Sequence, residues 1–497
     1  MYDLVIIGSG YGGSVVASRL AGHGSVLLLE RGKRWRMGQF PQGTTGLAGA
    51  LVTRLNPLGL FGMRLGAGTG NAYASGFGGA SLLNYGITTR PDTHVFGSWP
   101  VSMTDLDPWY RIALATLDPT ANPKREVDDD VIERLAPGCR ERIANTVTWE
   151  HCDACGHCIS GCNRGAKRSL DHTYLMSAQA RGVEVRCGSE VLEIRQGPPS
   201  DPTSWELVVA DTDRPNDTTI IPARRVVLAA GTFGTLDLLH RSRAALPLSP
   251  MFGKGVSMNG DSLAFLYDGP REVGTLHGAP IASAARIVAR DQDGKERTLF
   301  VMAGRIPTPL QRMAALTMLA LGPLFPPLKG VTPTGAAGAR RAMRDAIAPR
   351  VGGPLDHSFM FKVCAEDAAR GEIRFSPSGA VVDWADYGQD PVMQLARARL
   401  ESWWRELGGR RVPDLGSWPG MRHFGVHPLG GCRMGGAIED GVVDSYGHVF
   451  DPKGGFYPGL RIIDASIIPS ALGVPSSLTI AALAERAAQH LVTELAA

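Results

Sequence analysis

The sequence lacks an excess of charge of either sign. Its 497 residues carry 51 Lys and Arg against 48 Asp and Glu, which gives a formal net charge of only +3. It also lacks the basic stripe with interleaved aromatic residues that is typical of nucleic-acid-binding proteins. The composition, 44% hydrophobic and 20% charged, indicates an ordinary globular protein with no nucleic-acid partner.

Long hydrophobic runs are also absent. No stretch approaches the roughly 18 uninterrupted apolar residues that a transmembrane helix requires. The nearest candidate, residues 313–328, is interrupted by Gly322, Pro323, Pro326 and Pro327. We therefore expect no transmembrane segment. The run suits either an apolar hairpin packed on its own domain or a flap that makes peripheral contact with a membrane.

The first residues show no pattern of a secretory signal. Residues 2–7 are apolar but run directly into a glycine motif, without a basic region before them or a cleavage site after them. We therefore expect a cytoplasmic protein. In that compartment the eight cysteines are expected to be thiols or metal ligands rather than disulfides.

A dinucleotide-binding fingerprint follows the first predicted strand and opens a helix-compatible segment. Residues 8–13 read Gly-Ser-Gly-Tyr-Gly-Gly, which is the pattern G-x-G-x-x-G. Gly8 permits the tight turn, Gly10 lets the backbone approach a pyrophosphate, and Gly13 allows close packing of the helix on the strand. A second strand ends at Glu30, about 20 residues further on, where a carboxylate binds ribose hydroxyls. The motif predicts a Rossmann-like unit but does not distinguish NAD from FAD.

Five further motifs follow in a recognisable order along the chain. They are Gly-Gly-Ala-Ser-Leu-Leu-Asn from residue 78, Ala-Gly-Thr-Phe-Gly-Thr from 230, Asn-Gly-Asp from 259, His-Pro-Leu-Gly-Gly from 427 and Asp-Ala-Ser-Ile-Ile-Pro from 464. Together they resemble the glucose–methanol–choline (GMC) oxidoreductases, and most closely the bacterial cholesterol-oxidase-like branch. The resemblance implies bound FAD, a substrate domain that roofs the isoalloxazine ring, and oxidation of an alcohol.

The order of the segments predicts an α/β fold, α+β overall, in which one domain is discontinuous. Residues 1–110, 165–250 and 420–497 are expected to form a Rossmann-like FAD-binding domain. Residues 111–164 are a cysteine-containing connection. Residues 251–419, which are interrupted by Gly and Pro, are expected to form an inserted substrate-binding domain that the resemblance implies is built on an antiparallel sheet.

The resemblance also implies which residues lie against FAD. Asp464 matches an acid near the ribityl chain or pyrophosphate, Asn84 matches a residue beside the flavin, and Ala230 and Gly231 close a strand against the cofactor. For each, ordinary strand-end or turn chemistry is the alternative. The full predicted cofactor-binding set is Gly8, Gly10, Gly13, Glu30, Gly79, Ser81, Asn84, Ala230, Gly231 and Asp464.

His427 is the predicted catalytic acid/base. Removing hydride from an alcohol requires a base for the hydroxyl proton. An imidazole, with an ordinary pKa of about 6.5, suits that role at neutral pH. The family places Asn or His shortly after the Asp-Ala-Ser-Ile-Ile-Pro block, but this chain has Pro475, which carries no donor. The second hydrogen bond to the substrate is therefore assigned to Ser476, with water, Ser477 or a helix-capping role for Ser476 as alternatives.

The predicted reaction is oxidation of a CH–OH donor by hydride transfer to FAD. The resemblance favours a hydrophobic or sterol-like secondary alcohol, with oxygen or an external electron acceptor as the oxidant. One alternative is an FAD-containing lyase of the same family, resembling hydroxynitrile lyases. The other is an oxidase that uses oxygen, rather than a dehydrogenase that uses another electron acceptor.

Four of the cysteines are closely spaced. Cys152, Cys155, Cys158 and Cys162 reproduce the C-x2-C-x2-C-x3-C spacing of bacterial ferredoxins, although Asn163 stands where those proteins have Pro. Three interpretations remain open: a 4Fe-4S or 3Fe-4S cluster that passes electrons from the flavin, a structural zinc site, and a cysteine-rich loop without metal.

Overall fold

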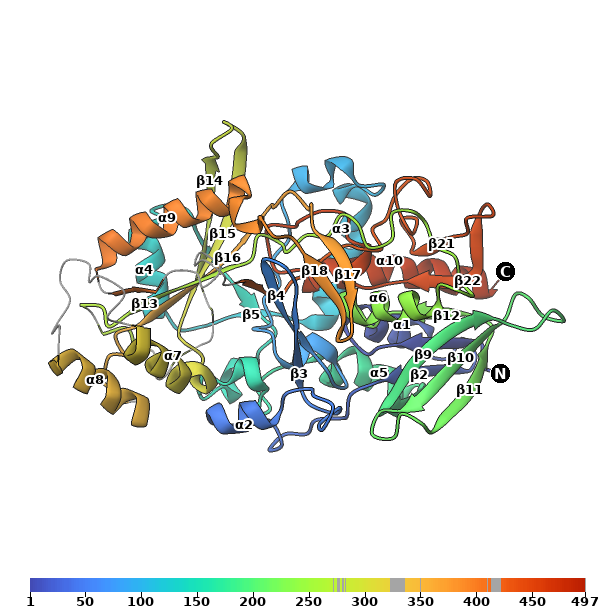
Figure 1. Cartoon of the computed structure of the whole chain (residues 1–497), viewed down its shortest axis with the longest axis horizontal. Coiled ribbons are helices and arrows are strands. Elements are labelled where there is room, and N and C mark those ends of the chain that lie inside the picture. Colours follow the sequence, from blue (N-terminus) through green and yellow to red (C-terminus); the bar gives the residue numbers. More distant parts are fainter. Residues whose placement is uncertain are drawn as a thin grey trace.

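A computed structural model describes residues 1–270, 272–274, 278, 281, 283–321, 336–348, 350–408, 410–412 and 422–496. Two large sheets dominate it. In Figure 1 the parallel sheet and both chain ends lie toward the right, and the antiparallel sheet lies toward the left. This mixed α/β architecture confirms the predicted fold class.

The first large sheet has the order β21-β22-β12-β1-β2-β8, and every pairing in it is parallel except that of β21 with β22. Its inner strands are buried on both faces, which explains why their sequences are continuous apolar runs rather than alternating ones. The strands are β1 (Leu4–Ile7), β2 (Val26–Glu30), β8 (Glu184–Cys187), β12 (Val226–Leu228), β21 (His448–Phe450) and β22 (Phe456–Ile462).

Segments far apart in the sequence therefore meet in one sheet. β12 lies between β1 and β22, so three distant parts of the chain build a single nucleotide-binding core. Helix α1 packs against α10 and α5, and α10 packs against α3. These helices are α1 (Tyr11–Leu20), α3 (Met103–Leu117), α5 (Tyr174–Ala180), α6 (Gly231–Ser242) and α10 (Ser477–Ala496).

The second large sheet is antiparallel, with the order β19-β13-β16-β15-β14-β6. Helix α9 (Pro391–Leu407) packs against it, with the rings of Trp403 and Phe361 5.4 Å apart. Its strands are β6 (Arg140–Arg142), β13 (Ser262–Tyr267), β14 (Ser283–Arg290), β15 (Glu296–Gly304), β16 (Phe359–Ala365) and β19 (Arg410–Val412). Strand β6 comes from the cysteine-containing connection, so the sheet extends beyond the segment 251–419.

Smaller elements complete the fold. A three-stranded antiparallel sheet is formed by β9 (Ser189–Gln196), β10 (Trp205–Asp211) and β11 (Thr218–Ala223), and another sheet by β3 (Phe61–Leu65), β4 (Thr69–Ala74) and β20 (His423–Gly425). Two two-stranded sheets are formed by β5 (Thr120–Ala121) with β7 (Ala144–Asn145) and by β17 (Glu372–Ser376) with β18 (Gly379–Asp383). The remaining helices are α2 (Gly43–Gly49), α4 (Val127–Leu135), α7 (Thr308–Leu321) and α8 (Ala336–Ile347).

The apolar run at residues 313–328 is only partly visible. Residues 313–321 belong to α7, and residues 322–328 lie outside the described residues. In the part of the chain that the structure describes, no helix combines the length and hydropathy needed for a membrane span.

Candidate active site and cofactor cradle

The glycine loop between β1 and α1 is closed by backbone contacts that leave no room for side chains. Gly8 has φ +100°, and a Cβ built on Gly13 would lie 1.9 Å from the Gly8 carbonyl oxygen. A Cβ on Gly12 would lie 1.7 Å from the carbonyl oxygen of Ile463 at the end of β22. The start of α1 is therefore held tightly against the glycine turn after β1 and against Ile463, the residue that follows β22.

Gly10 differs from its neighbours because a Cβ built there would meet nothing within 4 Å. It occupies the N-cap position of α1, and that helix has no side-chain cap. The 3-10 helix η1 (Gly79–Leu82) lies alongside, where a Cβ on Gly79 would approach the Gly10 Cα to 2.8 Å. Open space beside uncapped N–H groups at a helix N-terminus is the environment that a pyrophosphate requires.

Glu30 is buried beneath this loop. Its Oε2 accepts hydrogen bonds from Ser9 N at 3.1 Å and Ser9 Oγ at 2.6 Å, and its Oε1 accepts one from Gly32 N at 2.8 Å. A carboxylate has about four acceptor positions, so one remains for a ribose hydroxyl. Glu30 thus has a loop-positioning role that the sequence pattern did not indicate.

Asp464 organises the far side of the cradle. Its Oδ2 accepts from Gly231 N at 3.0 Å and Thr235 Oγ1 at 2.5 Å, and its Oδ1 accepts from Ser466 N at 2.9 Å and Ser466 Oγ at 2.6 Å. These four bonds fill the acceptor positions of the carboxylate. The contacts support the turn-chemistry alternative for its side chain: Asp464 joins the first turn of α6 to the turn after β22.

The other predicted cofactor residues lie around the same loop. Ala230 is the N-cap of α6, and its Cα would be 2.8 Å from a Cβ on Gly8. Ser81 Oγ donates to Gly78 O at 2.7 Å and accepts from Leu170 N at 3.0 Å, which makes it a local brace. Asn84 Nδ2 donates to the Tyr11 hydroxyl at 2.8 Å. The structure therefore brings the whole predicted set together, and the open space at Gly10 and the uncapped N-terminus of α1 fit a dinucleotide cofactor.

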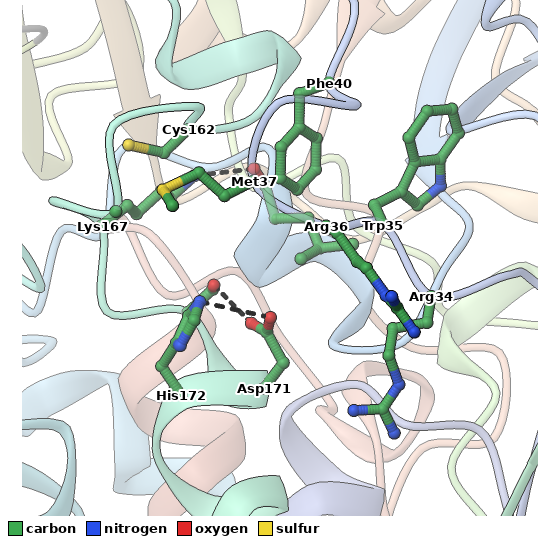
Figure 2. A pocket seen from close by; sticks show the side chains of 12 residues that line it. Arg34, Trp35, Arg36, Met37, Phe40, Cys162, Lys167, Asp171 and His172 are labelled. Atoms are coloured by element: carbon green, nitrogen blue, oxygen red, sulfur yellow. Dashed lines mark hydrogen bonds and ion pairs between the residues drawn. The ribbon is translucent and has the colours of Figure 1, made fainter.

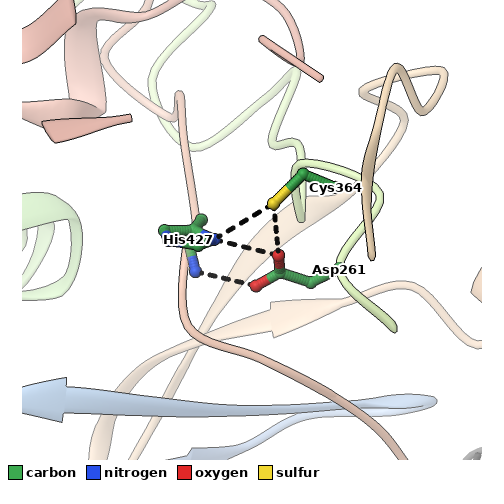
Figure 3. A group of neighbouring side chains, drawn as sticks. All are labelled: Asp261, Cys364 and His427. Carbon is green, nitrogen blue, oxygen red and sulfur yellow. Dashed lines mark hydrogen bonds and ion pairs between the residues drawn. The ribbon is translucent and has the colours of Figure 1, made fainter. Parts of the chain in front are cut away.

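His427 lies in a polar network shown in Figure 3. Its Nδ1 is 2.9 Å from Asp261 Oδ1, while its backbone N–H donates to Asp261 Oδ2 at 3.1 Å and that of Val426 donates at 2.6 Å. Lys362 Nζ is 2.5 Å from Asp261 Oδ1. Burial opposes ionisation of Asp261, but the adjacent His427 and Lys362 outweigh it and hold the pKa of this carboxyl well below its ordinary range.

These contacts fix the tautomer of His427. An ionised Asp261 can only accept, so the proton of a neutral imidazole lies on Nδ1 and the lone pair lies on Nε2. Nε2 has no hydrogen-bond partner among the described residues, and the His427 side chain is 19% exposed. The arrangement orients a proton acceptor with a carboxylate behind it, as a general base requires.

The His427 loop is attached directly to the cofactor cradle. Thr232 Oγ1, in the first turn of α6, donates to Pro428 O at 2.6 Å. Gly430 N donates to Ala465 O at 3.1 Å, next to Asp464. The candidate base and the glycine loop are thus parts of one assembly, joined through α6 and the turn after β22.

The segment before α10 is held near this assembly by Asn259. Its Nδ2 donates to Val474 O at 2.8 Å, and its Oδ1 accepts from Leu472 N at 2.8 Å and Gly473 N at 3.1 Å. Asn259 adopts φ +59° in the turn that carries Asp261. Ser476 is buried, and its carbonyl accepts from Ile480 N at 3.0 Å, which places it at the start of α10. This placement fits a helix-capping position, and its predicted catalytic role stays a prediction.

In the described residues, the cysteine segment does not form a site for a single metal ion. No three of the thiols of Cys152, Cys155, Cys158 and Cys162 have sulfur atoms within 4.8 Å of one another, whereas four thiolates about 2.3 Å from one zinc must lie closer than that. Burial raises the pKa of Cys158 to about 12, so its thiol is protonated at neutral pH. The distances do not fit a single zinc ion held by four thiolates, and no step is assigned to zinc or to an iron–sulfur cluster.

The same segment has a clear connecting role. Cys155 O accepts from Thr308 Oγ1 at 2.8 Å at the start of α7, and Ala154 O accepts from Gly278 N at 2.9 Å. Asn163, where ferredoxins have Pro, accepts through Oδ1 from Gly38 N at 2.8 Å and Phe40 N at 3.1 Å. These contacts favour the interpretation of a cysteine-rich loop that braces three parts of the chain.

A cavity of about 490 Å³ lies beside this loop (Figure 2). Its apolar wall includes Trp35 and Phe40, whose rings stack with centroids 6.0 Å apart. Lys167 also lines it, but its Nζ already donates to Leu82 O at 3.0 Å and Cys158 O at 3.3 Å. Burial lowers the pKa of Lys167 to about 8. Leu82, the last residue of η1, also lines the cavity, and none of the lining residues belongs to the His427 network.

Sequence reasoning missed two members of that network. Lys362 and Cys364 occupy alternate positions of β16, and the Cys364 thiol lies 3.6 Å from Asp261 Oδ1 and 3.9 Å from His427 Nδ1. They belong to no motif that points to the site. The available signal was a single lysine within an otherwise apolar strand, which marks a buried charge that needs a partner. Asp261 lay in a recognised motif but received no role.

Comparisons with known proteins agree with this geometry. Residues 3–254 match the model for the N-terminal part of the family described as GMC oxidoreductase, and residues 420–484 match the model for its C-terminal part. The chain is 28% identical to a cholesterol oxidase of Mycobacterium tuberculosis over 98% of its own length and 90% of the relative's. It is 24% identical to a cholesterol oxidase of Acinetobacter baumannii, with 99% and 94% covered.

More distant relatives share the architecture. A long-chain-alcohol oxidase of Arabidopsis thaliana is 23% identical, with 99% of this chain and 67% of that protein covered. Among solved structures, pyridoxine 4-oxidase from Mesorbium loti superposes with a TM-score of 0.65 at 16% identity, covering 98% of each chain. A fungal aryl-alcohol oxidase superposes with a TM-score of 0.62 at 15% identity, covering 100% and 99%. These structural matches show the same fold.

Proposed function

The chain belongs to the GMC oxidoreductase family and is an FAD-dependent alcohol oxidoreductase, and from this premise we propose that His427 is its catalytic base. The carrying observation is the contact of His427 Nδ1 with the buried carboxylate of Asp261 at 2.9 Å. That contact leaves Nε2 as the unprotonated nitrogen. The dyad supplies what alcohol oxidation needs from the protein: an oriented acceptor for the hydroxyl proton.

In the proposed mechanism, His427 Nε2 accepts the hydroxyl proton of the alcohol while Asp261, in contact with Nδ1, holds the ring in the orientation that this transfer needs. When bound, FAD supplies the acceptor for hydride from the carbinol carbon. The glycine loop and the N-terminus of α1 would hold its pyrophosphate, and the remaining acceptor position of Glu30 would hold a ribose hydroxyl. Ser476 is proposed to donate a second hydrogen bond to the substrate oxygen.

We propose a hydrophobic, sterol-like secondary alcohol as the substrate and oxygen as the electron acceptor. Two matched relatives are named cholesterol oxidases and a third is named a long-chain-alcohol oxidase. Leu316 of α7 and Met343 and Ile347 of α8 are 55%, 51% and 70% exposed. Such side chains suit reversible contact with a lipid surface that carries an apolar alcohol.

Oxygen consumption tests this proposal against a panel of sterols, long-chain primary alcohols, aryl alcohols and short polar alcohols. The purified, flavin-loaded enzyme is expected to turn over apolar alcohols fastest and to release one hydrogen peroxide per alcohol oxidised. Preference for short polar alcohols would contradict the substrate class. Turnover only with added one-electron acceptors, without peroxide, would contradict the choice of oxygen.

A further inference from the structure

Lys362 is a mostly buried cation that has no role in the proposed mechanism. It lies within β16, opposite Leu263 of β13, and its side chain is 12% exposed. An ammonium group in such a place is costly unless it is paired. Among the described residues its partner is Asp261, whose Oδ1 lies 2.5 Å from Lys362 Nζ.

The same oxygen atom also receives His427. Asp261 Oδ1 is 2.5 Å from the ammonium of Lys362 and 2.9 Å from Nδ1 of His427. From this shared oxygen we propose that Lys362 is a positioning residue that keeps His427 neutral, and hence a proton acceptor, at neutral pH. The inference rests on the proposed function for its catalytic meaning, but the effect of Lys362 on the His427 proton does not depend on any substrate.

The physical reason is charge balance. A buried carboxylate alone beside an imidazole stabilises the imidazolium strongly and would keep His427 protonated. With Lys362 present, the ammonium and the carboxylate already compensate each other, so protonating His427 adds an uncompensated positive charge to a buried site. Asp261 then orients the imidazole ring through Nδ1, while Nε2 remains unprotonated.

The other titratable groups near His427 are either neutral or bonded to other partners, so they do not compensate the charge of Asp261 as Lys362 does. The Cys364 thiol lies within 4 Å of both Asp261 and His427, but burial raises its pKa, so it stays neutral. The carboxylates that follow β16 are bonded elsewhere: Asp367 accepts from the backbone N–H groups of Met258 and Gly260, and Glu366 contacts His94. In the segment that precedes His427 in the chain, Arg422 donates to Gly66 O and His423 packs against Tyr387.

A pair of lysine variants tests the inference in the full-length flavin-loaded protein. Lys362→Met removes the charge but keeps most of the stem, and Lys362→Arg keeps the charge. The pH at which His427 loses its proton is read from the 13Cε1 resonance of labelled histidine, assigned by its loss in His427→Gln. We expect Lys362→Met to raise that pH by roughly one unit, and Lys362→Arg to leave it within a few tenths of a unit.

Kinetics gives the second readout. The acid limb of the pH profile for flavin reduction should move by the same amount and in the same direction in Lys362→Met, and not in Lys362→Arg. An unshifted His427 titration in a folded Lys362→Met protein would overturn the inference. Equal shifts in both variants would assign the effect to packing and also overturn it. If no alcohol reduces the flavin of any variant, the proposed function fails, while the histidine titration still decides the role of Lys362.

Discussion

Replacing His427 with Gln is expected to slow flavin reduction by a bound alcohol by about 10²–10⁴-fold, the usual worth of a positioned acid–base group. Gln retains hydrogen-bonding capacity near Asp261 but cannot accept a proton at neutral pH. The effect should fall on the reduction step, because the contacts that hold the glycine loop involve other residues. Anaerobic stopped-flow absorbance under saturating alcohol measures it directly.

Two controls make that result specific to the base. Flavin content of His427→Gln should equal that of the wild type, since the cradle is built by Gly8, Asp464 and their neighbours. Ser476→Ala should cost only about tenfold, the loss of one ordinary hydrogen bond. A His427→Gln enzyme with full flavin and wild-type reduction rates would remove His427 from the mechanism.

Two alanine substitutions in the glycine loop are expected to fail in different ways. A Cβ at Gly12 would lie 1.7 Å from Ile463 O, whereas a Cβ at Gly10 would meet nothing within 4 Å in the protein. Gly12→Ala must therefore shift backbone against backbone, at a cost of about 1–3 kcal/mol or more in folding stability. Gly10→Ala should fold normally and instead weaken FAD binding by roughly 10- to 100-fold, because its methyl group enters the space assigned to the pyrophosphate.

Thermal unfolding of flavin-free protein and titration with FAD separate the two effects. The melting temperature of flavin-free Gly10→Ala should match that of the wild type, and that of Gly12→Ala should fall clearly below it. Undiminished FAD affinity in Gly10→Ala would show that the pyrophosphate does not lie where the cradle places it. A normal melting temperature for Gly12→Ala would contradict the close contact with β22.

Local pattern was sufficient for the cofactor half of the molecule. The run from β1 through the glycine loop to Glu30 follows from spacing alone, because Gly8 and Gly13 answer steric demands of a strand–turn–helix unit and Gly10 leaves open space at the helix N-terminus. The meeting of β1, β12 and β22 was also predictable, since buried parallel strands are continuous apolar runs that end at small residues. The added role of Glu30 in holding Ser9 was not, because it depends on a contact that spacing does not encode.

The surroundings of the candidate base were less predictable, because the charges beside His427 lie on the antiparallel sheet and in the turn before it. His427 could be recognised from its motif, but its partners depend on which residues face one another across β13 and β16. Register between distant strands is set by packing of the whole sheet, and one residue of slip would turn Lys362 to the opposite face. The spacing of the cysteine segment left a cluster, zinc and a metal-free loop open, and it could not indicate that the segment contacts α7 and the loop at Phe40, because those contacts depend on the tertiary fold.

The central claim is that the enzyme removes hydride from the carbinol carbon of an alcohol, and one measurement tests it most directly. The flavin-loaded protein is mixed without oxygen with an alcohol from the active part of the panel, and with the same alcohol deuterated at the carbinol carbon, while the visible absorption of oxidised flavin is followed. We predict full bleaching with both, slowed by a primary isotope effect for the deuterated alcohol. Bleaching at equal rates would mean that carbinol C–H cleavage does not limit flavin reduction. Conversion of substrate with no bleaching would indicate lyase chemistry and would contradict the account.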